Sequence, residues 1–228
     1  LPESAIAVKS FVSTDLAEVI AKRYNCHFKN LLTGFKYIGE LITNLEAEGK
    51  ADDFVMGFEE SYGYLAGTHA RDKDAVVASM LICEMAAYYK TKNMNLVDVM
   101  NSLYDEYGYY ANDVESYTFE GAAGMEKMAE IMDNLRQNSP KQIGGLAVTA
   151  VSDYESGTTV HTDGRTETID LPKSNVIAFA LTDGNKVIVR PSGTEPKIKA
   201  YITAIGSDRK SADDLAKVLV SAASEFMK

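Results

Sequence analysis

The chain has 228 residues, of which 46% are hydrophobic and 25% charged, and its formal net charge is −10. These proportions are typical of a folded globular protein, and the acidic balance disfavours nucleic-acid binding, because phosphate backbones need clustered Lys and Arg. No run of about 18 apolar residues is present, so we expect no membrane partner. Cys26 and Cys83 lie in apolar segments, which favours buried reduced thiols and a cytoplasmic protein.

The first half of the chain alternates predicted strands and helices, which favours a parallel sheet covered by helices. Asp15 and Glu18 resemble a capping box at the start of the first helix. The stretch YYANDVESYTF is typical of an outer strand of this domain, and a closing helix follows it. Predicted strands are AIAVKSFV, the segment around residues 26–28 and DFVMGF; predicted helices cover about residues 15–24, 35–48, 73–89, 96–107 and 122–135.

The polar stretch RQNSPKQIGG contains Pro and Gly-Gly and is the predicted linker. Beyond it, strands joined by a hairpin turn at Asp183-Gly184 precede a final helix that Ser211 is expected to cap. The strand KIKAYITAI alternates apolar and polar residues, so one of its faces is expected in the core. We therefore predict an α/β fold. Residues 1–137 form a three-layer αβα domain with a mixed or parallel sheet, and residues 142–228 form a smaller α+β domain with an antiparallel sheet.

The stretch RPSGTEP combines groups that suit a phosphate. Arg190 offers a planar cationic fork, Ser192 and Thr194 offer hydroxyls, and Gly193 lets backbone N–H groups turn inward around an anion. The charge distribution agrees: residues 1–140 carry 12 Lys+Arg against 22 Asp+Glu, whereas residues 141–228 carry 11 of each. An ordinary polar turn between two strands is the alternative.

The acidic stretch GFEESYGY directly follows a predicted strand. In α/β sheets the loop that leaves a strand's carboxyl end is where ligands bind, and Glu59 and Ser61 have groups that pair with sugar hydroxyls. A solvated acidic loop is the alternative. Two acids also occur in glycosidases, but adjacent residues on extended backbone point apart, so Glu59 and Glu60 do not suit a catalytic pair.

Two further stretches carry cations beside predicted helix starts. Lys36 lies where the helix dipole disfavours a positive charge, which suggests a functional role. In HARDKD, Arg71 and Lys73 are secondary candidates for holding an anion. The three histidines lack the spacing of metal ligands, so no metal site is expected in this chain.

These stretches together resemble the C-terminal half, domains 3 and 4, of an α-D-phosphohexomutase of the phosphoglucomutase/phosphomannomutase family. RPSGTEPKIKAYI resembles the family's phosphate-binding loop, GFEESYGY its sugar-binding loop, and TGFKYIGE the segment with its active-site lysine. The resemblance covers essentially the whole chain. It implies an isomerase that interconverts hexose 1-phosphate and hexose 6-phosphate through a bisphosphate intermediate. The implied roles are phosphate binding by Arg190, Ser192, Gly193 and Thr194, sugar binding by Glu59 and Ser61, and proton transfer or charge balance by Lys36.

The sequence also departs from the family pattern. The family's phosphoserine loop and its DGDGDR-like magnesium loop do not occur in these residues. The resemblance therefore implies that Mg²⁺, a hexose bisphosphate primer and N-terminal domains belong to a full-length enzyme, and that this chain alone binds a phosphosugar without turnover. The alternatives are a stand-alone sugar-phosphate-binding regulatory module and a phosphopentomutase fragment. A nucleotide-phosphate binder is disfavoured, because no GxxxxGK[ST] pattern precedes a helix.

Overall fold

A computed structural model describes residues 1–193 and 195–228, and its backbone contacts divide the chain into two units. Unit 1 is Leu1–Gly108 and unit 2 is Tyr109–Lys228. This division differs from the linker predicted between residues 137 and 142, which lies inside unit 2.

Unit 1 is built on a mixed sheet with the strand order β2-β1-β3-β4. β1 pairs in parallel with β2 and β3, while β4 runs antiparallel to β3. The strands are β1 (Ile6–Ser10), β2 (His27–Leu31), β3 (Phe54–Glu59) and β4 (Gly63–Ala66); the helices are α1 (Leu16–Arg23), α2 (Phe35–Ala47), η1 (Ala51–Asp53), α3 (Ala75–Lys90) and α4 (Leu96–Tyr107).

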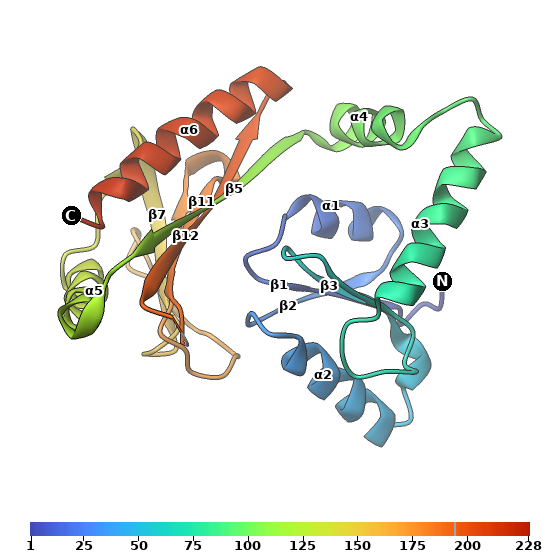
Figure 1. Cartoon of the computed structure of the whole chain (residues 1–228), viewed down its shortest axis with the longest axis horizontal. Helices are drawn as coiled ribbons and strands as arrows, with labels where there is room; N and C mark the ends of the chain where they lie inside the picture. Colours follow the sequence, from blue (N-terminus) through green and yellow to red (C-terminus); the bar gives the residue numbers. More distant parts are fainter. Residues whose placement is uncertain (194) are drawn as a thin grey trace. The chain divides into compact units, whose positions relative to one another are not determined.

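Alternate residues of β1 pack against different helices. Ile6 and Val8 belong to the apolar cluster of α2, whereas Ala7, and Ala5 just before the strand, pack with Ala21 of α1. Figure 1 shows α1 and α2 on opposite faces of the sheet. The predicted three-layer arrangement is confirmed for this unit.

The strand order of unit 1 creates a natural ligand-binding edge. The chain leaves β1 for β2 through α1 and leaves β2 for β3 through α2, so the two crossings lie on opposite faces. Ligands of open α/β sheets bind outside the carboxyl ends of the strands where the direction of winding reverses. In unit 1 that point lies between the ends of β1 and β3.

The helix α3 is apolar and contains no buried residue. The side chains of Val76, Met80 and Ile82 are each more than half exposed. Its start is fixed by Asp74, whose carboxylate accepts hydrogen bonds from two backbone N–H groups of the first turn. Within the described part of the chain, no helix has both the length and the apolar character needed to cross a membrane.

Unit 2 is an antiparallel sheet with the order β5-β12-β11-β10-β7-β8-β9, and β6 pairs with β7. Helices α5 and α6 share one apolar cluster with one face of this sheet (Figure 1). The predicted α+β fold with an antiparallel sheet is confirmed. The elements are β5 (Tyr109–Thr118), α5 (Gly121–Gln137), β6 (Gln142–Ile143), β7 (Leu146–Asp153), β8 (Thr158–His161), β9 (Thr166–Thr168), β10 (Ile177–Leu181), η2 (Thr182–Gly184), β11 (Lys186–Pro191), β12 (Lys197–Gly206) and α6 (Arg209–Glu225).

The long strand β5 explains where unit 2 begins. It pairs with β12 from Tyr109 opposite Gly206 to Thr118 opposite Lys197, so its whole length is bonded to the C-terminal sheet. The following helix α5 adds Met132 and neighbouring apolar residues to the same core. The sequence predicts this strand as an outer strand of the first domain; that prediction is wrong, because its partner is β12 in unit 2.

Two predicted helix caps differ in the structure. Asp15 precedes α1 but makes no capping hydrogen bond, because its carboxylate lies 3.0 Å from the buried ammonium of Lys9. At α6 the N-cap is Asp208, and Ser211 is its partner in the third helical position of a capping box. By contrast, the Asp183-Gly184 turn forms as predicted, with both residues at positive φ.

Candidate functional site

The acidic loop after β3 is bound directly to the start of α2. The Oε1 atom of Glu59 accepts a hydrogen bond of 2.6 Å from the backbone N–H of Gly34, the N-cap residue of α2. The Glu59 side chain is buried, with 7% of its surface exposed. A helix N-terminus carries a partial positive charge that favours an anion there. This contact joins the predicted sugar-binding loop to the TGFK segment.

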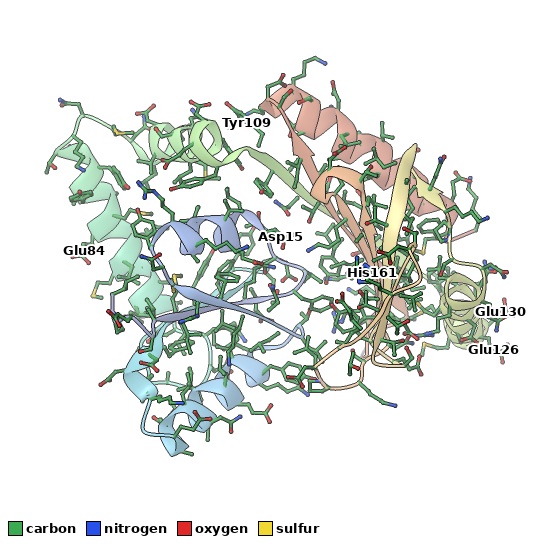
Figure 2. The ribbon with its side chains drawn as sticks, turned by 180° about the vertical axis from the view of Figure 1, so that it is seen from behind. Asp15, Glu84, Tyr109, Glu126, Glu130 and His161 are labelled. Atoms are coloured by element: carbon green, nitrogen blue, oxygen red, sulfur yellow. The ribbon has the colours of Figure 1, made fainter. Side chains whose placement is uncertain are left out.

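The loop after β1 holds the neighbouring acid. The Ser10 hydroxyl donates a hydrogen bond of 2.9 Å to Oε2 of Glu60, and it lies 2.7 Å from the Ser13 hydroxyl. The fully buried Lys9 ammonium donates to the Ser13 carbonyl at 3.0 Å and lies 3.0 Å from Asp15, at the start of α1 (Figure 2). A buried polar network therefore supports the acidic loop. The polar pair Lys9 and Ser10, directly after the apolar run AIAV and before Phe11 and Val12, is the signal that could have revealed this network.

The remaining predicted residues of unit 1 lie close in sequence to these contacts. Ser61 is exposed, two residues after Glu59. Lys36 is exposed in the first turn of α2, two residues after Gly34, and its Nζ lies 4.8 Å from the centre of the Tyr37 ring. The hydrogen bond between Gly34 and Glu59 brings the segments that carry Glu59, Ser61 and Lys36 to the same edge of the sheet.

The two secondary candidates have different surroundings. The Arg71 guanidinium donates to the Thr68 carbonyl at 2.7 Å and pairs with Glu46, so protein groups already occupy its fork. Lys73 lies beside the acidic loop, since its Cδ is 2.7 Å from the Cβ position of Gly63, and its Nζ pairs with Asp72 at 2.9 Å. Of these two cations, Lys73 is the one adjacent to the site.

In unit 2 the predicted phosphate-binding turn lines a cavity of about 400 Å³. Arg190, Ser192 and Gly193 contribute to its wall, together with Ser174 and Asn175 from the segment before β10. Apart from its two neighbours in the chain, no described residue has an atom within 4 Å of the point where a Cβ on Gly193 would sit, so the backbone there is open to close approach. Thr194, the other predicted member of this turn, lies outside the described residues.

Two cations lie side by side at this turn. Arg190 of β11 is directly opposite Lys199 of β12 in the antiparallel register, so their side chains share one face of the sheet. Among the residues that the structure describes, no acid forms an ion pair with either side chain. The nearby Lys197 is paired instead with Glu195, at 2.7 Å. Like charges in direct register repel, and an anion would relieve that repulsion.

A larger cavity of about 610 Å³ in unit 2 has a different charge balance. Its most buried cation, Arg136, is neutralised by Asp153 and Glu155 at 3.3 and 2.6 Å. His161, labelled in Figure 2, is the last residue of β8, and its Nε2 atom lies 3.1 Å from Glu167. Because Arg136, the arginine in its wall, is already paired with two acids of the protein, this cavity is a weaker anion site than the one at Arg190.

Comparison with known proteins identifies both units. The family profile described as "Phosphoglucomutase/phosphomannomutase, alpha/beta/alpha domain III" matches residues 1–107, and the profile of the C-terminal domain of the same family matches residues 126–221. The chain belongs to the phosphoglucomutase/phosphomannomutase family. The acidic loop lies in the domain III match, and the turn at Arg190 lies in the C-terminal match.

Relatives in this family are much longer than the chain. It is 40% identical over 200 residues to the phosphoglucomutase of Staphylococcus epidermidis and 37% identical over 204 residues to that of Staphylococcus haemolyticus. These matches cover 87% and 89% of the chain but only 36% of each relative. The chain therefore spans about a third of the phosphoglucomutases that it matches.

Solved structures of the family share the fold at low sequence identity. The open form of the phosphoglucomutase pp63/parafusin from Paramecium matches 98% of the chain with a TM-score of 0.63 and 21% identity, over 38% of that protein. A Thermus thermophilus protein described as a phosphomannomutase matches 99% of the chain with a TM-score of 0.61 and 18% identity, over 37% of that protein.

Proposed function

We propose that this chain is the substrate-binding half of a phosphoglucomutase/phosphomannomutase-type isomerase. Such an enzyme interconverts hexose 1-phosphate and hexose 6-phosphate through a bisphosphate intermediate. In this proposal unit 1 binds the sugar hydroxyls, and unit 2 binds the phosphate group that is not being transferred.

The observation that carries the proposal is the adjacent cations Arg190 and Lys199, which have no acidic partner among the described residues, near the open backbone of Gly193. A phosphate monoester carries between one and two negative charges near neutral pH, which would offset the repulsion between the two cations. The Arg190 fork matches two phosphate oxygens, and the Ser192 hydroxyl adds a donor. Thr194 would add a second hydroxyl.

The sugar-binding role in unit 1 rests on donor and acceptor chemistry. Oε1 of Glu59 is held by Gly34, and the carboxylate retains acceptor capacity for sugar hydroxyls. Ser61 is exposed and can both donate and accept a hydrogen bond. These groups tolerate a sugar bound in either orientation, which a bisphosphate intermediate requires. Lys36 would lie near the reacting oxygen and balance its charge or transfer a proton.

The magnesium ion of the family does not fit the residues present. Among the described residues, no three His, Cys, Asp or Glu side chains come together in a group able to hold a metal ion. The proposal therefore routes no step through Mg²⁺. The phosphoserine nucleophile and the ion would belong to the additional length of the relatives, so the chain alone is expected to bind a sugar phosphate without turnover.

Binding measurements on the chain test the proposal. We expect glucose 6-phosphate to bind at least tenfold more tightly than glucose in an NMR titration, and Arg190→Gln to weaken that binding at least tenfold. Arg165→Gln is the matched control, because this exposed arginine of unit 2 is paired with Asp163. Equal affinities for glucose and glucose 6-phosphate, or an Arg190→Gln variant that binds normally, would overturn the proposal.

Two further measurements test its finer parts. Glucose 1-phosphate with a bisphosphate primer should give no product with the chain alone; turnover at a rate normal for the family would contradict the predicted inactivity. Tighter binding of ribose 5-phosphate than of glucose 6-phosphate would favour the phosphopentomutase alternative.

A further inference from the structure

The hairpin between β3 and β4 has an unusual residue at its tip. The last paired residues are Glu59 and Gly63, so Glu60, Ser61 and Tyr62 form a three-residue loop. Tyr62 has a φ of 62°, in the left-handed region. Three-residue hairpin loops commonly need this conformation at their last position, where Gly is favoured because a side chain is strained there.

Other residues with this conformation are of the expected types. Among the residues that the structure describes, the remaining non-glycine residues with positive φ are Asn25, Asn93 and Asp183. Asn and Asp tolerate the left-handed region through local hydrogen bonds, whereas a bulky side chain there is a genuine outlier. Tyr62 is thus the exception in the described part of the chain.

The ring of Tyr62 gains no packing that would offset this strain. The residue is 89% exposed. Within the described structure its side chain has no hydrogen bond, ion pair or ring contact. A residue that breaks a local rule without a gain in folding stability is expected at a functional position.

The base of the loop is fixed on three sides. Glu59 is bound to the start of α2 and Glu60 to the loop after β1. A Cβ on Gly63 would lie 2.7 Å from Cδ of Lys73, so the backbone fits closely against that side chain. The exposed ring therefore extends from a rigid support, next to Ser61.

We propose that Tyr62 is a sugar-binding and specificity-determining residue, whose ring stacks on the apolar C–H face of the hexopyranose phosphate that Glu59 and Ser61 hold. This inference rests on the proposed function. A tyrosine ring supplies a large, rigid and partly apolar contact at low entropic cost. A six-membered pyranose offers a broader C–H face than a five-membered furanose, so the ring favours hexose over pentose phosphates.

The test uses substitutions at Tyr62 with two opposite readouts. Tyr62→Asn relieves the strained conformation, so we expect the Tm of unit 1 to rise by about 4 °C or more. The same variant should bind glucose 6-phosphate five- to tenfold more weakly, while inorganic phosphate binds unchanged. Tyr62→Phe keeps the ring and should match the wild type in both measurements. Tyr24→Asn, at another exposed tyrosine of unit 1, should leave both ligands' affinities unchanged.

The outcomes separate this inference from the proposed function. A wild-type chain that binds no sugar phosphate refutes the proposed function, and the role of Tyr62 falls with it. If the wild-type chain binds glucose 6-phosphate and Tyr62→Asn binds it equally tightly, only the role of Tyr62 is refuted. A fall in Tm for Tyr62→Asn would contradict the strain argument, because it would mean that the ring stabilises the fold.

Discussion

Replacing Asp15 by Asn should destabilise unit 1 far more than replacing its partner Lys9 by Met. Lys9 is fully buried, and its ammonium lies 3.0 Å from the Asp15 carboxylate and 3.0 Å from the Ser13 carbonyl. Asp15→Asn removes the carboxylate that lies 3.0 Å from this buried cation. Lys9→Met removes the cation and leaves Asp15 at a position where it reaches water, with its side chain 28% exposed.

The expected size follows from this asymmetry. Removing one partner of a buried ion pair costs about 3–5 kcal/mol, whereas an apolar replacement of similar volume is often nearly neutral. Because Lys9 retains the Ser13 carbonyl and Asp15 is partly exposed, we expect about 2–3 kcal/mol for Asp15→Asn. This corresponds to a fall of roughly 10 °C or more in the Tm of unit 1. We expect Lys9→Met to cost less than about 1 kcal/mol.

Hydrogen exchange of the β1 amides in urea would measure the free energy of unfolding of unit 1 within the whole chain. The matched control is Glu18→Gln, which breaks an exposed ion pair of 3.1 Å with Lys22 on α1 and should cost less than about 0.5 kcal/mol. The Lys9→Met/Asp15→Asn double variant should resemble Lys9→Met alone. If Asp15→Asn is no more destabilising than Glu18→Gln, the assignment of a buried, tightly coupled pair is refuted.

Three other predictions concern the cation pair, its turn and a helix cap. Gly193→Ala should leave the Tm within about 1 °C, because the added Cβ meets no described atom outside its chain neighbours. The same variant should bind phosphate about tenfold more weakly, and unchanged binding in calorimetry would contradict this. Lys199→Gln should stabilise unit 2 by about 0.5 kcal/mol at low salt by removing the repulsion from Arg190, and by less in 1 M salt; a gain that does not depend on salt would speak against it. The hydrogen bond from His69 and two backbone N–H groups hold the pKa of Asp74 below its ordinary range. The pKa of Asp74 is lower in the folded chain than in the unfolded chain. Asp74 therefore stabilises α3 fully above its unfolded pKa, and this stabilisation is lost as the pH falls through its folded pKa. An NMR titration of the Asp74 carboxyl with a midpoint at or above the ordinary aspartate value would contradict this.

Local patterns predicted the strands and turns that depend only on neighbouring residues. Ile198, Ala200 and Ile202 alternate along β12, and all three are buried in the core of unit 2. The Asp183-Gly184 turn forms because both residue types accept positive φ. These features need no information from distant parts of the chain.

Contacts between distant residues explain the differences. Asp15 does not cap α1, because its carboxylate forms an ion pair with Lys9, six residues earlier. The alternation in β5 predicted a strand, but it could not identify β12 as the partner about 90 residues later. The loops of the candidate site were also recognisable in sequence, whereas the Gly34–Glu59 bond that joins two of them spans 25 residues. The functional roles of the individual site residues stay predictions.

The pairing of β5 with β12 has a consequence for synthesis on the ribosome. β5 ends at residue 118 and its partner begins at residue 197, so about 80 residues must be added before the first bond can form. At 5–20 residues per second, β5 waits for roughly 4–16 s, whereas unit 1 is already complete at residue 108. During that delay β5 has no strand partner, and the charges of Asp113, which is exposed in the folded chain, and of the partly exposed Glu115 disfavour pairing with other nascent chains.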